Sequence, residues 1–116
     1  LIADDSPSIR KFISFALTMD GYEVISASDG MEAIEKIPSS KVDLVITDLN
    51  MPNIDGFELI RVIRGNNELK EVPIIILSSL SSNEDIEHGL SCGANSYLVK
   101  PFNPKRIQYE VSKYLN

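Results

Sequence analysis

Short apolar runs alternate with stretches of helical periodicity along the whole chain. The runs cover residues 1–3, 22–27, 44–47, 74–77 and 97–99. A fully apolar run such as 74–77 is typical of a strand that is buried on both faces of a sheet. Strands that alternate with amphipathic helices indicate βα units around a parallel sheet. The pattern therefore predicts an α/β fold with five such units and a doubly wound, five-stranded parallel sheet.

Polar capping residues mark where four of the five expected helices begin. These residues are Ser6, which Pro7 follows, then Asp29, Asp55, and Asn103, which Pro104 follows. Short polar side chains accept the free amide hydrogens of a first turn, and proline suits the first helical position. The first helix has an apolar stripe that we expect to face the sheet, formed by Ile9, Phe12, Ile13, Ala16 and Leu17.

The expected helix near residues 83–92 differs from the others. Its apolar face comprises little beyond Ile86 and Leu90, and Gly89 lies between them. A narrow apolar stripe buries little surface, and glycine lowers helix propensity. We therefore expect this helix to hold to the sheet less firmly than the others and to be mobile.

Length and composition limit the class of protein. The chain has 116 residues, of which 43% are hydrophobic and 24% charged, which suits one globular domain over residues 1–116. The first strand is short, so we expect that a few N-terminal residues precede it. A formal net charge of −6 argues against direct binding to nucleic acid. One cysteine, no signal peptide and no apolar stretch long enough to span a membrane predict a soluble, cytoplasmic protein.

Polar residues follow four of the five expected strands. Asp4 and Asp5 come after the first, Asp48 after the third, Ser78 after the fourth and Lys100 after the fifth. The second strand contributes nothing comparable. The carboxyl ends of parallel strands meet at one edge of a sheet, and ligands bind there where the strand order reverses. With the order 2-1-3-4-5, these five side chains converge on one site.

Three carboxylates in one site repel each other unless a cation lies among them. Oxygen ligands without histidine or cysteine suit a hard ion, and an incomplete protein shell that leaves room for water favours Mg²⁺. Asp5 and Asp48 would ligate it directly. The metal, the Lys100 ammonium and the Ser78 hydroxyl would then neutralise the oxygens of a transferring phosphoryl group. Asp48 is the expected nucleophile.

Four segments together, "ADDSP", "TDLNMPNIDG", "LSS" and "VKPF", resemble the receiver domain of two-component response regulators, the CheY-like family. The resemblance covers essentially the whole chain and implies a flavodoxin-like (βα)5 fold. It implies that Asp48 is a phosphoacceptor, which takes a phosphoryl group from a histidine kinase, a phosphotransfer protein or a small phosphodonor. It also implies signal transduction rather than enzymatic turnover of a separate substrate.

The resemblance assigns further roles at the site. Asp4 and Asp5 match the family's acidic pair, and Asn50 matches the residue whose backbone carbonyl completes the Mg²⁺ shell. Lys100 matches the lysine that pairs with the phosphoryl oxygens, and the Lys100-Pro101 bond is expected to be cis. Only a proline makes such a bond common.

The resemblance also implies a switch and a surface that responds to it. Ser78 matches the hydroxyl that moves toward the phosphoryl group, and Tyr97 matches the aromatic residue that turns inward behind it. The responding face would comprise the fourth helix, the fifth strand and the fifth helix, and would control a downstream protein or an effector domain. A homodimer on activation is a further possibility. Ser79 replaces a frequent alanine, and Leu80 and Asn50 match positions that tune phosphoryl lifetime.

Simpler interpretations and other functions remain open at this point. Asp48 could be a turn aspartate, Tyr97 ordinary packing, His88 a solvated side chain and Cys92 a small packing residue. A phosphatase of the haloacid dehalogenase type would need a second acid two residues after its nucleophile, where this chain has Asn50. An unphosphorylated binding module is the third class. The sequence leaves open the pathway, the cognate kinase, the oligomeric state, and whether the chain is a stand-alone protein or a fragment.

Overall fold

The computed structural model describes residues 1–115 and contains one five-stranded parallel sheet in the order β2-β1-β3-β4-β5. Asn116, the last residue of the expected domain, lies outside the described residues. The strands are β1 (Ile2–Ala3), β2 (Ser26–Ala27), β3 (Val45–Thr47), β4 (Ile74–Ser78) and β5 (Ser96–Val99). Every residue of β1, β3 and β4 is buried, as the apolar runs predicted. The predicted strand order and the flavodoxin-like fold are confirmed.

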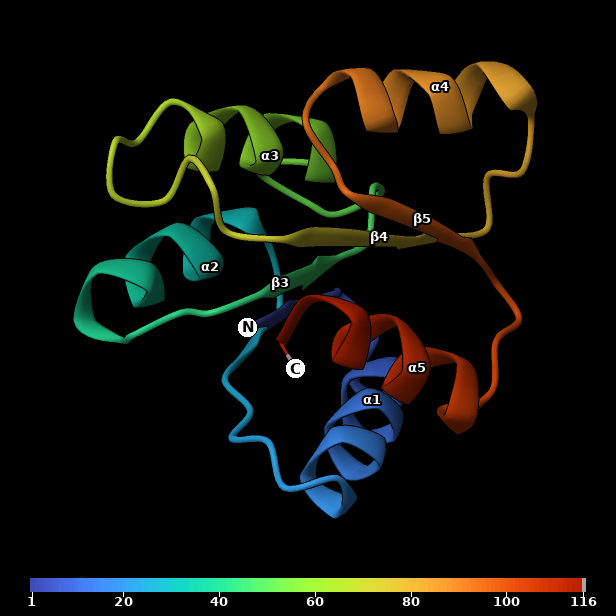
Figure 1. Ribbon diagram of the computed structural model, residues 1–116. Helices are drawn as coiled ribbons and strands as arrows, with labels where there is room; N and C mark the ends of the chain where they lie inside the picture. The colour runs from blue at the N-terminus through green and yellow to red at the C-terminus, as the bar shows by residue number, and fades with distance from the viewer. Residues whose placement is uncertain (116) are drawn as a thin grey trace.

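Five α-helices cover the two faces of the sheet (Figure 1). They are α1 (Pro7–Met19), α2 (Gly30–Lys36, followed by the short 3-10 helix η1, Ile37–Ser39), α3 (Gly56–Arg64), α4 (Asn83–Ser91) and α5 (Pro104–Leu115). Residues of α1 and α5 pack with one core cluster, which includes Ile13, Leu17, Ile107 and Val111. Residues of α2 and α3 pack with the other, which includes Ala33, Leu59 and Ile63. The helices begin at the predicted caps: Ser6, Asp29 and Asp55 each accept an amide hydrogen bond from the first turn.

Two predictions were wrong, one about the length of a strand and one about the orientation of a side chain. The second strand was expected over residues 22–27, but only Ser26–Ala27 is paired, because its neighbour β1 is itself two residues long. Tyr22 and Val24 lie outside the paired strand and pack against the α1–α5 cluster instead. Phe12 was expected to face the sheet, but it lies at the margin of its stripe, is 38% exposed and contacts Phe102 with ring centroids 6.1 Å apart.

Helix α4 contacts the sheet through a glycine. Gly89 is its one fully buried residue, whereas Ile86 is half-buried and Leu90 is 42% exposed. A Cβ atom at Gly89 would lie 2.7 Å from Ile76 Cδ1 and 3.1 Å from the ring of Tyr97. The backbone of α4 therefore lies directly over β4 and β5. The narrow apolar face is confirmed, and the mobility of α4 stays a prediction.

Three contacts join α4 and the turn after it to α3. His88 is exposed, as predicted, and its ring stacks on Phe57 with centroids 4.2 Å apart. Arg64 Nε donates to the carbonyl of Gly93 at 2.9 Å, and Arg64 Nη2 donates to Asn95 Oδ1 at 2.9 Å. Arg64 thus anchors the turn between α4 and β5.

Candidate functional site

Three acidic side chains meet at the carboxyl ends of β1 and β3. One ligand oxygen from each of Asp4, Asp5 and Asp48 lies within 4.8 Å of the other two. Asp4 and Asp48 are buried at 1% and 7% exposure, and Asp5 is exposed. Within residues 1–115 this is the one group of three side chains that could hold a metal ion. The sheet therefore brings the predicted acidic trio together.

The backbone around Asp48 is tightly held. Its amide extends the ladder to Ala3 by donating to that carbonyl at 2.9 Å. Its Oδ1 accepts the amide hydrogen of Leu49 at 2.7 Å, and its carbonyl accepts the hydroxyl of Thr47 at 2.8 Å. Gly56 N donates to the Leu49 carbonyl at 2.9 Å, which brings the start of α3 onto the end of β3. The strand therefore presents a carboxylate whose direction is fixed before any ligand binds.

Asp4 is the most buried acid of the trio. Its Oδ1 accepts the amide hydrogen of Ser6 at 2.9 Å, and its carbonyl accepts Arg10 Nη1 at 2.6 Å. Burial raises the pKa of Asp4 above its ordinary value, and the nearby charge of Asp48 raises it further, against the Ser6 hydrogen bond and the Lys100 charge. The surroundings of Asp4 thus disfavour the ionised form of its carboxyl group.

Lys100 reaches the acidic trio from the end of β5. Its Nζ lies 3.3 Å from Asp4 Oδ2 and 3.3 Å from Asp48 Oδ2. Its amide donates to the carbonyl of Ser78 at 2.7 Å, and the Lys100-Pro101 bond is cis, as predicted. One ammonium therefore bridges two buried carboxylates, and the three acids still carry an excess of negative charge.

Ser78 and Tyr97 are linked through the main chain of one residue, Leu80. The buried Ser78 Oγ accepts the amide hydrogen of Leu80 at 3.1 Å. The hydroxyl of the half-buried Tyr97 donates to the carbonyl of Leu80 at 2.7 Å. The Ser78 carbonyl accepts the Lys100 amide, so Ser78 lies beside the Lys100 backbone. The Tyr97 ring lies on the far side of Leu80, under Gly89 of α4. We call these contacts the Ser78–Leu80–Tyr97 relay.

Asn50 is exposed in the loop between β3 and α3. The loop follows Asp48 directly and places this residue on the same edge of the sheet as the acidic trio. The predicted role of its carbonyl as a metal ligand stays a prediction.

The residues of the trio fit a magnesium ion. All three ligand side chains are carboxylates, which hard divalent cations prefer, and two of them are buried with a single ammonium for compensation. Burial and, to a smaller extent, the charge of Asp48 raise the pKa of Asp4, and a divalent cation beside the carboxylate would offset both effects. Asp4, Asp5 and Asp48 would hold it, with the Asn50 carbonyl as the expected fourth protein ligand.

The raised pKa of Asp4 predicts a pH-dependent effect of Asp4→Asn in metal-free protein. The folded state binds the proton of the Asp4 carboxyl group more tightly than the unfolded state does. The stability that this proton contributes is fully present below the unfolded pKa of about 4, and it is lost as the pH rises through the raised pKa of the folded state. Asparagine keeps an oxygen for the Ser6 amide. We therefore expect Asp4→Asn to raise the melting temperature by a few degrees at pH 7, and the gain to shrink toward pH 4. A gain that is equal at both pH values would contradict this origin.

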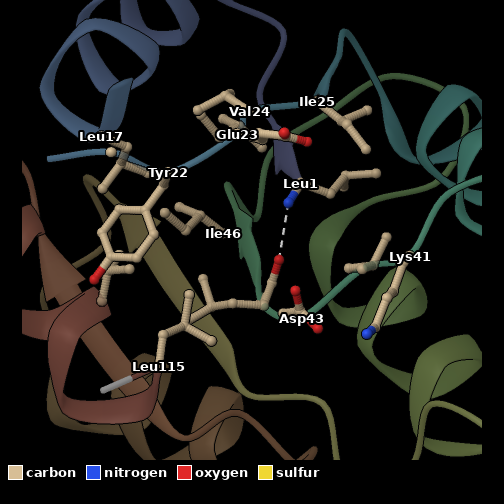
Figure 2. Close-up of a pocket in the computed structure, with 15 residues that line it drawn as sticks. Leu1, Leu17, Tyr22, Glu23, Val24, Ile25, Lys41, Asp43, Ile46 and Leu115 are labelled. Carbon is tan, nitrogen blue, oxygen red and sulfur yellow. Dashed lines mark hydrogen bonds between the residues drawn. The ribbon is translucent and has the colours of Figure 1, made fainter. Parts of the chain in front are cut away.

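A cavity of about 290 Å³ opens at the opposite end of the sheet (Figure 2). Its lining includes Leu1, Tyr22, Lys41, Asp43 and Leu115, and the amino group of Leu1 donates to the carbonyl of Leu44 at 2.8 Å. These residues precede β1, β2 or β3 or end α5, so they lie at the other edge of the sheet from Asp48. Asp43 is therefore a useful distant control for the carboxylates of the site.

Sequence reasoning missed several residues that shape this edge. Arg10 holds the Asp4 carbonyl, and Gly56 leaves room for the Asp48 carbonyl, where a Cβ atom would lie 2.2 Å away. Asp29 and Asn53 are hydrogen-bonded to each other at 2.9 Å. Asp29 was predicted only as a helix cap, and the one signal at Asn53 is that asparagine between proline and a later glycine is typical of a turn.

Comparison with known proteins identifies the family to which this fold and this acidic site belong. The family model "Response regulator receiver domain" matches residues 1–112. The probable transcriptional regulator ycf27 of Guillardia theta is 42% identical over 99% of this chain, and the match covers 44% of that regulator. The chain thus spans less than half the length of this relative. None of the helices in residues 1–115 is long and apolar enough to cross a membrane.

Solved structures share the fold of this chain. Chemotaxis protein CheY4 of Vibrio cholerae superposes with a TM-score of 0.92 at 39% identity, over 97% of this chain and 94% of that one. The receiver domain of a sensor histidine kinase from Pseudomonas aeruginosa superposes with a TM-score of 0.89 at 30% identity, over 98% of this chain and 93% of that one. That domain has a magnesium ion coordinated in its active site cleft. With a family model over nearly its full length and an acidic pocket of the kind that binds Mg²⁺ in receiver domains, the chain belongs to the response regulator receiver domain family.

Proposed function

We propose that this receiver accepts a phosphoryl group on Asp48 in a Mg²⁺-dependent reaction, and that phosphorylation alters the face formed by α4, β5 and α5. A histidine kinase or a phosphotransfer protein would be the donor, and a downstream protein or an effector domain would be the target. One observation carries the proposal. Lys100 Nζ lies 3.3 Å from the buried carboxylates of both Asp4 and Asp48, in an acidic cluster that also offers oxygen ligands for a cation.

The reaction would be an in-line transfer to a carboxylate oxygen. The new P–O bond forms to Asp48 as the P–N bond to the donor imidazole breaks, and the imidazole leaves with the bonding electron pair and takes up a proton from water. Mg²⁺, when bound, would neutralise charge on the carboxylates and on the phosphoryl oxygens. The Leu49 amide, which donates to Asp48 Oδ1 at 2.7 Å, fixes the orientation of the nucleophile.

Lys100 and Ser78 would stabilise the product. The Lys100 ammonium, now shared between two carboxylates, can pair with the phosphoryl oxygens once Asp48 has become an acyl phosphate. The Ser78 hydroxyl can donate to the same group by turning away from the Leu80 amide, which it now accepts at 3.1 Å. Both contacts exist only in the phosphorylated state, which is the differential interaction that a population shift requires.

The Ser78–Leu80–Tyr97 relay would carry this change to the surface. Release of the Leu80 amide frees the residue whose carbonyl holds the Tyr97 hydroxyl at 2.7 Å. The Tyr97 ring lies against Gly89, so a movement of the ring alters the contact that seats α4 on the sheet. The α4–β5–α5 face would therefore have two forms, which the partner binds differently. We propose that this takes place in the cytoplasm and that the protein turns over no separate substrate.

Incubation with a small acyl phosphate tests the proposal directly. With Mg²⁺ present, we expect one phosphoryl group per chain, and peptide mapping by mass spectrometry should place it on Asp48. A chelator should suppress the uptake, because the repulsion among the carboxylates then opposes the approach of a phosphate. Phosphate on another residue, or equal uptake with and without Mg²⁺, would refute the proposal.

A further inference from the structure

We propose that Asp29 and Asn53 form a bridge that positions the metal-binding loop, residues 49–55, and that the turn after β2 thereby serves the site without contributing a ligand. This inference rests on the proposed function for its biological meaning, whereas the bridge itself is a contact between described residues. Asp29 and Asn53 would be positioning residues. They are 24 positions apart in the sequence and come from opposite sides of β1 in the sheet order.

Asp29 uses its two carboxylate oxygens for two different elements. Oδ1 accepts the amide hydrogen of Glu32 at 2.8 Å and caps α2. Oδ2 accepts Asn53 Nδ2 at 2.9 Å. The Glu32 amide is the main cause that lowers the pKa of Asp29, and the Asn53 amide adds to it. Serine or asparagine would cap α2 as well as aspartate does, so capping alone does not require the second oxygen.

Asn53 lies at the sharpest point of the loop. Its φ is 69°, in the left-handed region that asparagine and glycine tolerate best. The amide of Ile54 donates to the carbonyl of Pro52 at 2.9 Å and closes the turn around Asn53. The side-chain amide that bonds Asp29 therefore extends from the tip of the loop.

A backbone contact beside the bridge holds the same loop. Gly30, the first residue of α2, packs so closely that a Cβ atom there would lie 2.5 Å from the carbonyl oxygen of Ile54. At the base of the loop, Gly56 N donates to the Leu49 carbonyl at 2.9 Å. The loop is thus closed at its base by α3 and held near its tip by α2. Asn50, the expected carbonyl ligand, lies between these two supports.

Breaking the bridge should weaken Mg²⁺ binding without unfolding the protein. Asp29→Ser keeps the cap on α2 and removes the second oxygen, and Asn53→Gly keeps the positive φ and removes the amide. For each variant we expect the dissociation constant for Mg²⁺, measured calorimetrically with the metal alone, to rise about three- to tenfold, as loss of one ordering hydrogen bond permits. The metal-free melting temperature should change by no more than a few degrees.

Exchanging the two residues between positions 29 and 53 tests whether the hydrogen bond, and not either residue by itself, determines Mg²⁺ affinity. Asn53→Asp alone places two carboxylates face to face and should weaken Mg²⁺ binding. The double variant Asp29→Asn with Asn53→Asp restores one donor and one acceptor, and should return the affinity to within about twofold of the original. The matched control is Asp43→Ser, the same substitution at the opposite edge of the sheet, where Asp43 lines the cavity of Figure 2. Its Mg²⁺ affinity should be unchanged.

The outcomes distinguish the bridge from the proposed function. Unchanged Mg²⁺ affinity in Asp29→Ser and Asn53→Gly, or a double variant no better than Asn53→Asp, would overturn the bridge. A protein without measurable Mg²⁺ affinity would overturn it as well. If affinity follows the bridge but no phosphoryl group is found on Asp48, the bridge stands and the proposed function fails.

Discussion

Asp48→Asn is expected to abolish phosphoryl uptake while the fold is retained. The amide has no anionic oxygen to attack phosphorus, so the rate with an acyl phosphate and Mg²⁺ should fall by at least about a thousandfold. The fold should survive because an asparagine oxygen can still accept the Leu49 amide that Asp48 Oδ1 now accepts at 2.7 Å. Phosphoryl incorporation by mass spectrometry measures the first effect, and far-ultraviolet circular dichroism measures the second.

Asp43→Asn is the matched control for this loss. Asp43 lines the cavity at the opposite end of the sheet, so the same chemical change there should leave the rate unaltered. A folded Asp48→Asn protein that still takes up phosphate at the original rate would show that another group is the acceptor.

Gly56→Ala should cause the largest loss of stability of the substitutions considered. A Cβ atom at this position would lie 2.2 Å from the Asp48 carbonyl oxygen and 2.8 Å from the Leu49 Cα. Both atoms belong to the backbone at the end of the central strand β3, so neither can move aside as a side chain would. We expect the free energy of unfolding, measured by urea denaturation, to fall by about 2–3 kcal/mol. Phosphoryl uptake should fall too, because Asp48 would be displaced.

Gly65→Ala provides the comparison within the same helix. Gly65 ends α3 with a φ of −81°, which any residue adopts, and the nearest atom to an added Cβ would be the Arg61 carbonyl oxygen at 3.2 Å. The change in stability should stay within about 1 kcal/mol. Equal losses in Gly56→Ala and Gly65→Ala would mean that the crowding at Asp48 is relieved by a small shift of α3.

The sheet and the main site residues were predictable because their signals are local and strong. The apolar runs at 44–47 and 74–77 could hardly be anything but buried strands, and parallel strands leave one choice for the edge where Asp48 and Lys100 emerge. The convergence of Asp4, Asp5, Asp48 and Lys100 follows from that topology and from the strand order. Ser78 was placed at the same edge by the same reasoning.

Other features depend on pairs of residues that no local pattern relates. The second strand was predicted too long because alternation of side chains in 22–27 cannot show that its neighbour β1 pairs over only two residues. The buried contact of α4 was invisible as well, because Gly89 adds nothing to an apolar stripe. Asp29 looked like a cap and nothing more, since its second partner, Asn53, is in a distant loop.

The relay from Ser78 to Tyr97 passes through the peptide groups on either side of Leu80 and not through its side chain. Sequence drift at position 80 can therefore change the polarity and size of the surroundings of the pocket while the connection itself persists. Nineteen of the twenty amino acids supply the same amide hydrogen and carbonyl oxygen, and proline alone lacks the hydrogen. If the proposed function holds, substitutions at position 80 can therefore alter the lifetime of the phosphoryl group while the main-chain link between Ser78 and Tyr97 is kept.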